Sequence, residues 1–237
     1  MVSKLLRFES GRAQVVGSIG NAAGLRETKL VTALAECDLV EIRLDVLAAE
    51  NALDRAAWHH LSGLPILFTA RCHEEGGAVD STADQRAEWL SLALDDAAAI
   101  DIEVANLGQM AGIVATLTAR GIPLVASTHD FSGTPPMPSW REKLEIALAA
   151  GAAVFKVAAR VHSPSDVSAL AGFQVLDHGL PVATMGMGPL APVSRLMCAQ
   201  YGSVLNYGYL GSVPTAPGQW SAARLKEAIA ALEPIVV

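Results

Sequence analysis

Lys156 is the one uncompensated charge in an apolar segment, residues 152–159. The segment is short, rich in Val and Phe, and begins just after Gly151, which predicts a buried strand. Burial disfavours the charged ammonium, so we expect a lowered pKa, and a neutral lysine amine is a nucleophile toward carbonyl groups. The alternative is a structural lysine that pairs with a carboxylate or extends its stem to solvent.

His129 follows another strand-like segment, residues 122–128, and would lie one strand away from Lys156. An imidazole beside a buried amine is suited to move protons near neutral pH. A further strand-like segment ends at Arg71, and the loop after it carries Glu75 just before two glycines, which suggests a flexible loop that presents a carboxylate. These residue types together predict imine chemistry, in which the imine acidifies the neighbouring carbon and the histidine transfers its proton.

Charged side chains recur with strand periodicity in two other segments. Glu41, Arg43 and Asp45 alternate with apolar residues, and Asp101 and Glu103 share one face of a later strand-like segment. Successive side chains of a strand point to opposite faces, so the apolar set can pack under helices while the charged set points into a closed barrel. Charges in such an interior need partners or a ligand.

Arg195 lies near the start of a predicted helix, after a turn built of small residues. Its guanidinium can bind a carboxylate in a bidentate manner, and the helix N-terminus adds a favourable dipole; an exposed helix charge is the alternative. A later tight turn offers hydroxyl and amide groups, those of Thr215 and Gln219. Lysine, histidine, arginines and a glutamate around one rim predict an anionic, polyhydroxylated carbonyl compound as substrate.

The elements that must position these residues alternate regularly along the chain. Strand-like segments occur at 14–19, 39–45, 65–71, 100–104, 122–128, 153–158, 181–186 and 203–207. Helix-like segments follow at 25–37, 51–62, 82–98, 107–120, 139–150, 164–178, 190–201 and 218–232. Eight such units predict an α/β fold, a (β/α)8 TIM barrel that forms a single domain over residues 1–237, with its active site at the C-terminal ends of the strands. A doubly wound sheet is the alternative, but no G-x-G-x-x-G motif follows the first strand.

The composition argues against several classes of protein. The net charge is −7 and basic residues are scattered, which disfavours binding to nucleic acid or to an anionic membrane surface. No apolar stretch approaches the roughly 20 residues of a membrane span, and the N-terminus lacks a long apolar segment with a cleavage site, so we expect a cytoplasmic protein. The three cysteines are widely spaced, which indicates reduced thiols, and no residues have convincing metal-ligand spacing, so we predict no metal.

Six motifs in this order resemble the type I 3-dehydroquinate dehydratases, the imine-forming enzymes of the shikimate pathway and of aromatic amino acid biosynthesis. The resemblance runs across nearly the whole chain. The motifs are Glu41-Ile42-Arg43-Leu44-Asp45, Arg71 with Glu75-Gly76-Gly77, His129-Asp130-Phe131, Phe155-Lys156-Val157-Ala158, Met185 to Arg195, and Ala216-Pro217-Gly218-Gln219.

The resemblance implies a hydro-lyase (EC 4.2.1.10) that acts on 3-dehydroquinate. Lys156 would form an imine with the ketone, and His129, oriented by Glu75, would remove the C2 proton and then help the C1 hydroxyl leave, giving 3-dehydroshikimate by syn elimination. Substrate-binding roles would fall to Ser18, Glu41, Arg43, Arg71, Arg195, Thr215 and Gln219. The family needs no metal and no organic cofactor, and its members commonly form homodimers.

Two other functions are compatible with a lysine-bearing barrel. One is a class I aldolase or transaldolase, but such barrels usually bind phosphorylated sugars through glycine-rich loops after strands seven and eight, where this chain has arginine and glutamine instead. The other is a non-catalytic barrel that only binds ligands. The presence of Lys156, His129 and Glu75 together speaks against it.

Overall fold

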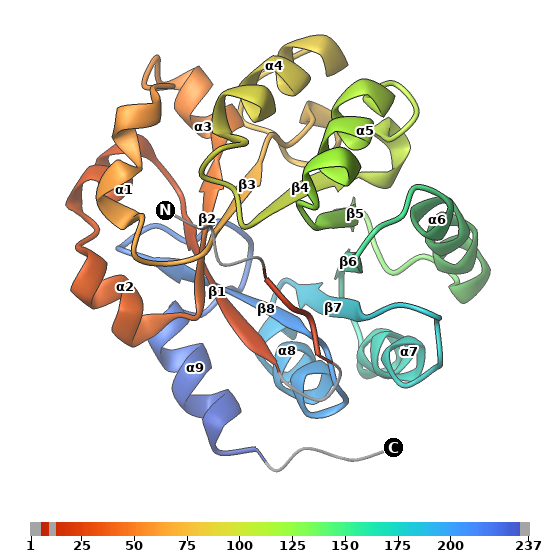
Figure 1. Ribbon diagram of the computed structural model, residues 1–237. Coiled ribbons are helices and arrows are strands. Elements are labelled where there is room, and N and C mark those ends of the chain that lie inside the picture. Colours follow the sequence, from red (N-terminus) through yellow and green to blue (C-terminus); the bar gives the residue numbers. More distant parts are fainter. Residues whose placement is uncertain (1–5, 10–12, 233–237) are drawn as a thin grey trace.

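The computed structural model describes residues 6–9 and 13–232, and within them eight strands form one sheet of parallel neighbours (Figure 1). The strand order is β7-β6-β5-β4-β3-β2-β1-β8. The strands are β1 (Gln14–Ile19), β2 (Leu39–Arg43), β3 (Ile66–Thr69), β4 (Ala99–Glu103), β5 (Leu124–Asp130), β6 (Val154–Arg160), β7 (Val182–Met187) and β8 (Leu205–Leu210). This nearly closed barrel confirms the predicted (β/α)8 fold. The predicted domain limits, 1 and 237, lie outside the described residues.

The two ends of this strand order, β7 and β8, meet along a seam with few backbone contacts. The backbone N–H of Val204 donates to the carbonyl of Val182 at 3.1 Å. The hydroxyl of Ser203 accepts the N–H of Thr184 at 3.1 Å and lies 3.4 Å from the carbonyl oxygen of the same residue. The seam therefore depends on a serine side chain where the other strand pairs use a full backbone ladder.

Helices surround the barrel on the outside (Figure 1). They are α1 (Ala22–Glu27), α2 (Leu30–Glu36), α3 (Leu44–Ala49), α4 (Ala83–Ala93), α5 (Ala111–Arg120), α6 (Met137–Ala149), α7 (Pro164–Gln174), α8 (Ala191–Gln200) and α9 (Ala222–Ala230). Capping boxes at Thr82 and Ser163 begin α4 and α7, because each side chain accepts a backbone N–H of the first turn. None of the described helices is long and apolar enough to cross a membrane.

Two predicted helices differ from the structure. The segment 25–37 is broken into α1 and α2 at Thr28, which is extended and whose hydroxyl donates to the carbonyl of Gly24. The segment 51–62 contains only two short 3₁₀ turns, Arg55–Ala57 and His59–Leu61, because the α-helix of this connection begins earlier, at Leu44. The second strand accordingly ends at Arg43, and Asp45 lies in the first turn of α3.

The barrel interior has an apolar layer and a polar layer. The apolar layer contains side chains such as Val16, Leu39, Leu67, Val125 and Val154, all fully buried. Side chains of a strand alternate between its two faces, so the next inward-facing residue lies two positions further along, nearer the C-terminal end of the strand. Those residues include Ser18, Glu41, Thr69, Asp101, Ser127, Lys156 and Tyr207. The fold thus places its buried polar groups toward the end where barrel enzymes carry their sites.

Candidate active site

Lys156 of β6 lies inside the barrel and is 3% exposed. Its Nζ donates to Oδ2 of Asp101 at 2.9 Å and lies 4.2 Å from the centre of the Tyr207 ring. No residue of the apolar segment balances this charge, but a carboxylate from β4 pairs with it, as in the alternative of a lysine paired with a carboxylate. Burial nevertheless lowers the pKa of Lys156; Asp101 opposes that effect and the nearby Arg71 adds to it.

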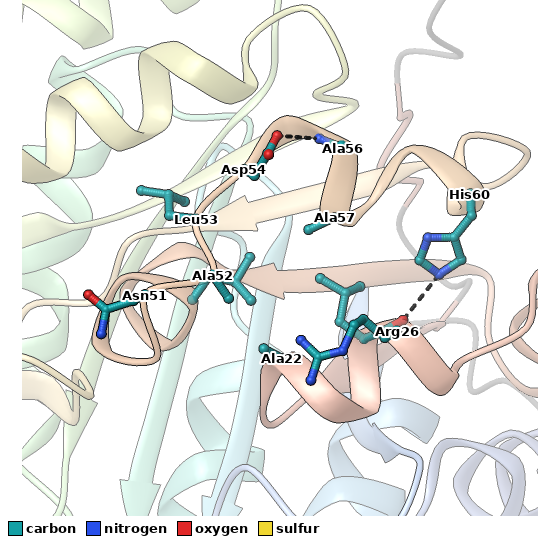
Figure 2. Close-up of a pocket in the computed structure, with 11 residues that line it drawn as sticks. Ala22, Arg26, Asn51, Ala52, Leu53, Asp54, Ala56, Ala57 and His60 are labelled. Atoms are coloured by element: carbon teal, nitrogen blue, oxygen red, sulfur yellow. Dashed lines mark hydrogen bonds between the residues drawn. The ribbon is translucent and has the colours of Figure 1, made fainter.

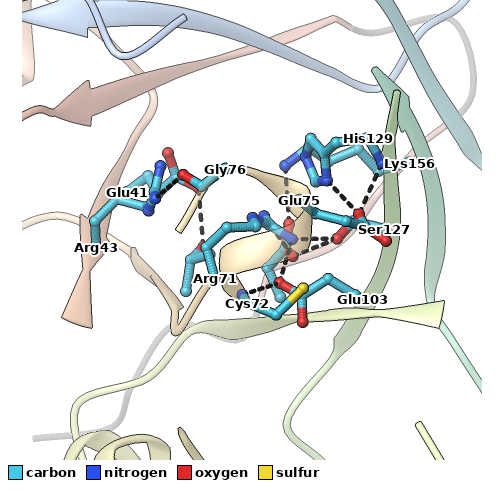
Figure 3. A network of polar contacts seen from close by, with 12 residues as sticks. Glu41, Arg43, Arg71, Cys72, Glu75, Gly76, Glu103, Ser127, His129 and Lys156 are labelled. Carbon is cyan, nitrogen blue, oxygen red and sulfur yellow. Dashed lines mark hydrogen bonds and ion pairs between the residues drawn. The ribbon is translucent and has the colours of Figure 1, made fainter. Parts of the chain in front are cut away.

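Arg71, which lies just after β3, connects this pair to a larger buried network (Figure 3). Its Nη2 contacts Asp101 at 2.8 Å, and its Nη1 contacts Glu103 at 2.7 Å and Ser127 at 2.8 Å. Burial alone would raise the pKa of Asp101, but Arg71 and Lys156 outweigh it and hold the pKa at about 2. The strand periodicity placed Asp101 and Glu103 on one face without revealing that they pair with the lysine and the arginine.

His129 of β5 and Glu75 of the loop after β3 form a second polar unit (Figure 3). Oε2 of Glu75 lies 2.8 Å from Nδ1 of His129 and accepts its backbone N–H at 2.8 Å. Burial lowers the pKa of His129 well below its usual value, with Arg71 and Lys156 adding to the effect, and burial raises the pKa of Glu75 to about 7. A carboxylate on Nδ1 favours the tautomer with its proton there, which leaves Nε2 as the basic nitrogen.

Strand pairing brings the lysine and the histidine together as predicted. Ser127 is the register partner of Lys156 on β6, and His129, two residues further on, faces Ala158. Both side chains therefore point inward from neighbouring strands, and the histidine lies one inward position nearer the C-terminal end.

Arg43 and Asp45 hold the Glu75 loop against the barrel. The guanidinium of Arg43 makes two contacts with the carboxylate of Asp45, at 2.8 and 2.6 Å, and Nη2 also donates to the carbonyl of Gly76 at 3.0 Å. Asp45 in turn accepts the backbone N–H groups of Arg71 and Ala78. Asp45 thus fixes the loop through backbone contacts from the first turn of α3.

Glu41 of β2 is buried between two hydroxyl groups. Ser18 of β1 donates to its Oε2, and Thr69 of β3 donates to its Oε1 at 2.9 Å. Ser18 and Glu41, which were both predicted to bind the substrate, therefore lie side by side in the barrel interior.

Arg195 of α8 is 2% exposed, so the alternative of an exposed helix charge was wrong. Nη1 donates to the backbone carbonyl of Tyr207 at 2.6 Å, and Nε is buried without a partner. Burial lowers the pKa of Arg195 to about 10. Among the described residues no carboxylate pairs with it, so its charge is available to an anionic ligand.

Thr215 and Gln219 lie in the loop after β8. Oε1 of Gln219 accepts both the backbone N–H and the hydroxyl of Thr215, at 2.8 and 2.9 Å. This loop contacts the loop after β7, because the N–H of Gly188 donates to the carbonyl of Pro217 at 2.9 Å. The two loops are thereby joined at the side of the barrel that carries Arg195.

Residues 6–9 and 13–232 contain no group of three His, Cys, Asp or Glu side chains that could hold a metal ion.

An open pocket of about 730 Å³ lies outside the barrel, between α1 and the segment 51–60, with Arg26, Asp54 and His60 in its wall (Figure 2). None of the predicted site residues lines it, so this pocket is separate from the polar interior.

A parallel barrel with a buried lysine, a histidine on the neighbouring strand and an arginine that pairs with no described carboxylate is typical of a TIM-barrel enzyme. Residues 22–235 match the family model for type I 3-dehydroquinase. The 3-dehydroquinate dehydratase of Haloarcula marismortui is 36% identical over 215 residues, 85% of this chain and 90% of the relative, and that of Haloquadratum walsbyi is 34% identical over 203 residues, 81% and 83%. The chain therefore belongs to the type I 3-dehydroquinase family, a family of hydro-lyases, as the motifs predicted.

A solved structure agrees with this assignment. The crystal structure of 3-dehydroquinate dehydratase from Geobacillus kaustophilus superposes with a TM-score of 0.81 at 26% identity, and covers 94% of this chain and 90% of that chain. The barrel described above is thus the fold of that enzyme.

Proposed function

We propose that the chain eliminates water reversibly from 3-dehydroquinate, giving 3-dehydroshikimate, through an imine on Lys156. The observation that carries this proposal is the buried lysine with His129 on the neighbouring strand, in a chain of the type I 3-dehydroquinase family. Burial lowers the pKa of Lys156, which favours the neutral, nucleophilic form of its amine relative to that of an exposed lysine. An imine at the substrate ketone withdraws electrons and acidifies the carbon beside it.

His129 is proposed as the acid and base of the elimination. Its contact with Glu75 through Nδ1 leaves Nε2 free to remove the C2 proton, and the same nitrogen can return a proton to the departing C1 hydroxyl. One histidine that serves both steps from one side accounts for syn elimination. Glu75 is proposed to orient the ring and to set its tautomer.

The remaining predicted residues are proposed to bind the substrate. Arg195 has no carboxylate partner among the described residues and would hold the substrate carboxylate, supported by the neighbouring loop of Thr215 and Gln219. The ring hydroxyl groups would contact the polar groups of the first three strands and their loops: Ser18, Glu41, Arg43 and Arg71. A homodimer, a cytoplasmic location and independence of cofactors stay predictions.

Borohydride trapping tests this function directly. We expect 3-dehydroquinate and borohydride together to modify Lys156 irreversibly, as seen by peptide mass spectrometry, and Lys156→Ala to abolish turnover. His129→Ala should still form the imine but lose at least about 1,000-fold in kcat. Lys226→Ala is the matched control, because that lysine contacts the carbonyl of Cys37 on the outside of the barrel.

Three outcomes would contradict parts of the proposal. An unmodified Lys156 would rule out the imine, and near-normal turnover by His129→Ala would rule out its assigned role. Release of an aldehyde in place of the absorbing enone product would favour the aldolase alternative.

A further inference from the structure

The hydroxyl of Tyr207 is buried and has no hydrogen-bond partner among the described residues. Tyr207 is only 5% exposed, so solvent does not provide the missing partner freely. An unpaired buried hydroxyl costs stability, because the group loses its water without replacing it. Buried hydroxyl groups without a hydrogen-bond partner are rare in native proteins, and those that occur often have a functional role. The position of Tyr207 indicates what that role is.

Tyr207 connects the two charged groups on which the proposed function depends. The face of its ring lies 4.2 Å from Nζ of Lys156, and its backbone carbonyl accepts Nη1 of Arg195 at 2.6 Å. Nε of Arg195 is the other donor here that is buried without a partner. One unpaired donor thus belongs to the residue beside the nucleophile and the other to an arginine bound to that residue's backbone, and a ligand with oxygen atoms could satisfy both.

The hydroxyl of Tyr207 keeps its proton, so it can act as a hydrogen-bond donor. Burial raises its pKa well above the usual value, and the negative charges of Glu41 and Asp101 raise it further. The nearby carboxylates do not accept this proton themselves, since Glu41 is taken by Ser18 and Thr69 and no bond from the phenol reaches either acid. The proton is thus free for an incoming acceptor.

We propose that Tyr207 is a further catalytic residue, whose hydroxyl donates a hydrogen bond to the ketone oxygen of the substrate while Lys156 attacks. This inference rests on the proposed function and assigns one more group to the same site. The ring face beside Nζ places the phenol at the edge of the space that the attacked carbonyl must enter. The developing negative charge on that oxygen would strengthen the bond, which is the condition for catalysis by a fixed donor.

The step balances without any added reagent. The neutral Nζ forms the C–N bond, the C=O π electrons move onto oxygen, and that oxygen takes a proton to give the carbinolamine. The nitrogen lone pair then forms the C=N bond as the C–O bond breaks, and the oxygen leaves as water. Both protons of that water derive from the Lys156 ammonium, relayed by His129, and its third proton stays on the nitrogen of the protonated imine, while Tyr207 stays protonated throughout.

Tyr207→Phe separates this role from a structural one, because it removes only the hydroxyl. We expect kcat/KM for 3-dehydroquinate to fall about 10- to 100-fold, and the rate of borohydride-trappable imine formation to fall by the same factor. The free variant should unfold at the same temperature as the wild type or at a higher one, since an unpaired polar group has been removed. A structural hydroxyl would give the reverse, with stability and activity lost together.

Tyr201→Phe is the matched control, because that tyrosine ends α8 outside the barrel. It should leave kcat/KM unchanged. If wild type dehydrates the substrate but Tyr207→Phe forms the imine at the wild-type rate, the inference is wrong and the proposed function stands. If wild type neither dehydrates 3-dehydroquinate nor is trapped by borohydride, the proposed function fails, and that failure is visible without the variant.

Discussion

At the scale of single residues, the environment of His129 and Glu75 favours the uncharged form of each. One carboxylate oxygen serves both the ring Nδ1 and the backbone N–H of His129, which fixes the ring in two directions. Burial lowers the pKa of His129 and raises that of Glu75 to about 7. The ring is therefore neutral near pH 7, as a general base must be, and the carboxyl is poised to gain or lose its proton there.

This pair makes the stability of the protein depend on pH. The carboxyl of Glu75 titrates near 4.5 without these surroundings and near 7 in the folded protein, so folding binds the proton more tightly. The stabilisation is complete below about pH 4.5 and is lost as pH rises through 7, on the order of 3 kcal/mol at about 1.4 kcal/mol per pKa unit.

Urea unfolding of wild type and Glu75→Gln across this range measures the effect. The free energy of unfolding of wild type should fall relative to that of the variant as pH rises. A constant difference between the two proteins would show that Glu75 keeps the same pKa on unfolding.

The partner of Lys156 illustrates what a sequence cannot resolve at this scale. The apolar segment indicated a buried lysine with a lowered pKa, and a lysine paired with a carboxylate was the alternative. Lys156 has both properties, because it is buried with a lowered pKa and also pairs with Asp101. Asp101 lies on β4 and Lys156 on β6, with β5 between them. Their contact crosses the barrel interior. Strand periodicity predicts which face of the sheet a side chain lies on, but it does not predict which side chain of another strand that side chain contacts.

At the scale of elements, the loop after β3 is a rigid support for Glu75. At Gly77 the chain turns back toward the end of β3, and the N–H of Gly77 donates to the carbonyl of Cys72 at 2.8 Å. A Cβ at this position would lie 2.3 Å from the carbonyl oxygen of Arg71, which is backbone and cannot move aside easily. The two glycines that suggested a flexible loop thus permit a tight turn.

Gly77→Ala should displace this loop and the carboxylate that it carries. Because Glu75 would then lose its geometry toward His129, we expect kcat to fall about 10-fold or more. Gly108→Ala is the control, since a Cβ there would meet no atom within 4 Å, and its kcat should not change. Equal kcat values in steady-state assays of both variants would contradict this account of the loop.

The elements themselves were predictable where local pattern and tertiary structure agree. All eight strands lie close to their predicted ranges, because short apolar runs suit strands buried on both faces. The connection after β2 differed because the alternation of Arg43, Leu44 and Asp45 looked like strand, whereas Asp45 lies in the first turn of α3, where it accepts the backbone N–H groups of two later residues. That requirement comes from the third strand and its loop, and no local pattern shows it.

At the scale of the whole molecule, the β7–β8 seam closes the barrel between two parts of the site. Lys156 lies on β6, one strand from β7, and Tyr207 lies on β8 itself. Their contact therefore depends on how firmly the seam is held. Ser203, fully buried, provides the side-chain bridge there.

Ser203→Ala should loosen this closure. The variant leaves the N–H of Thr184 without its acceptor, so we expect a loss of about 1 to 3 kcal/mol in the free energy of unfolding, and faster hydrogen exchange at Thr184 and Val204. Ser91→Ala, on the exposed face of α4, should change the free energy by less than about 0.5 kcal/mol. Indistinguishable exchange rates in the two variants would show that the seam does not need the serine.

The ion pair of Asp101 with Lys156 has a consequence for the proposed covalent intermediate. The nitrogen carries one positive charge as a resting ammonium and again as a protonated imine, so the carboxylate faces the same charge before and after the bond forms. A buried network reorganises little when no net charge enters or leaves it, and its members can stay in place. The barrel would thereby hold the intermediate with the same side-chain arrangement that stabilises the free enzyme.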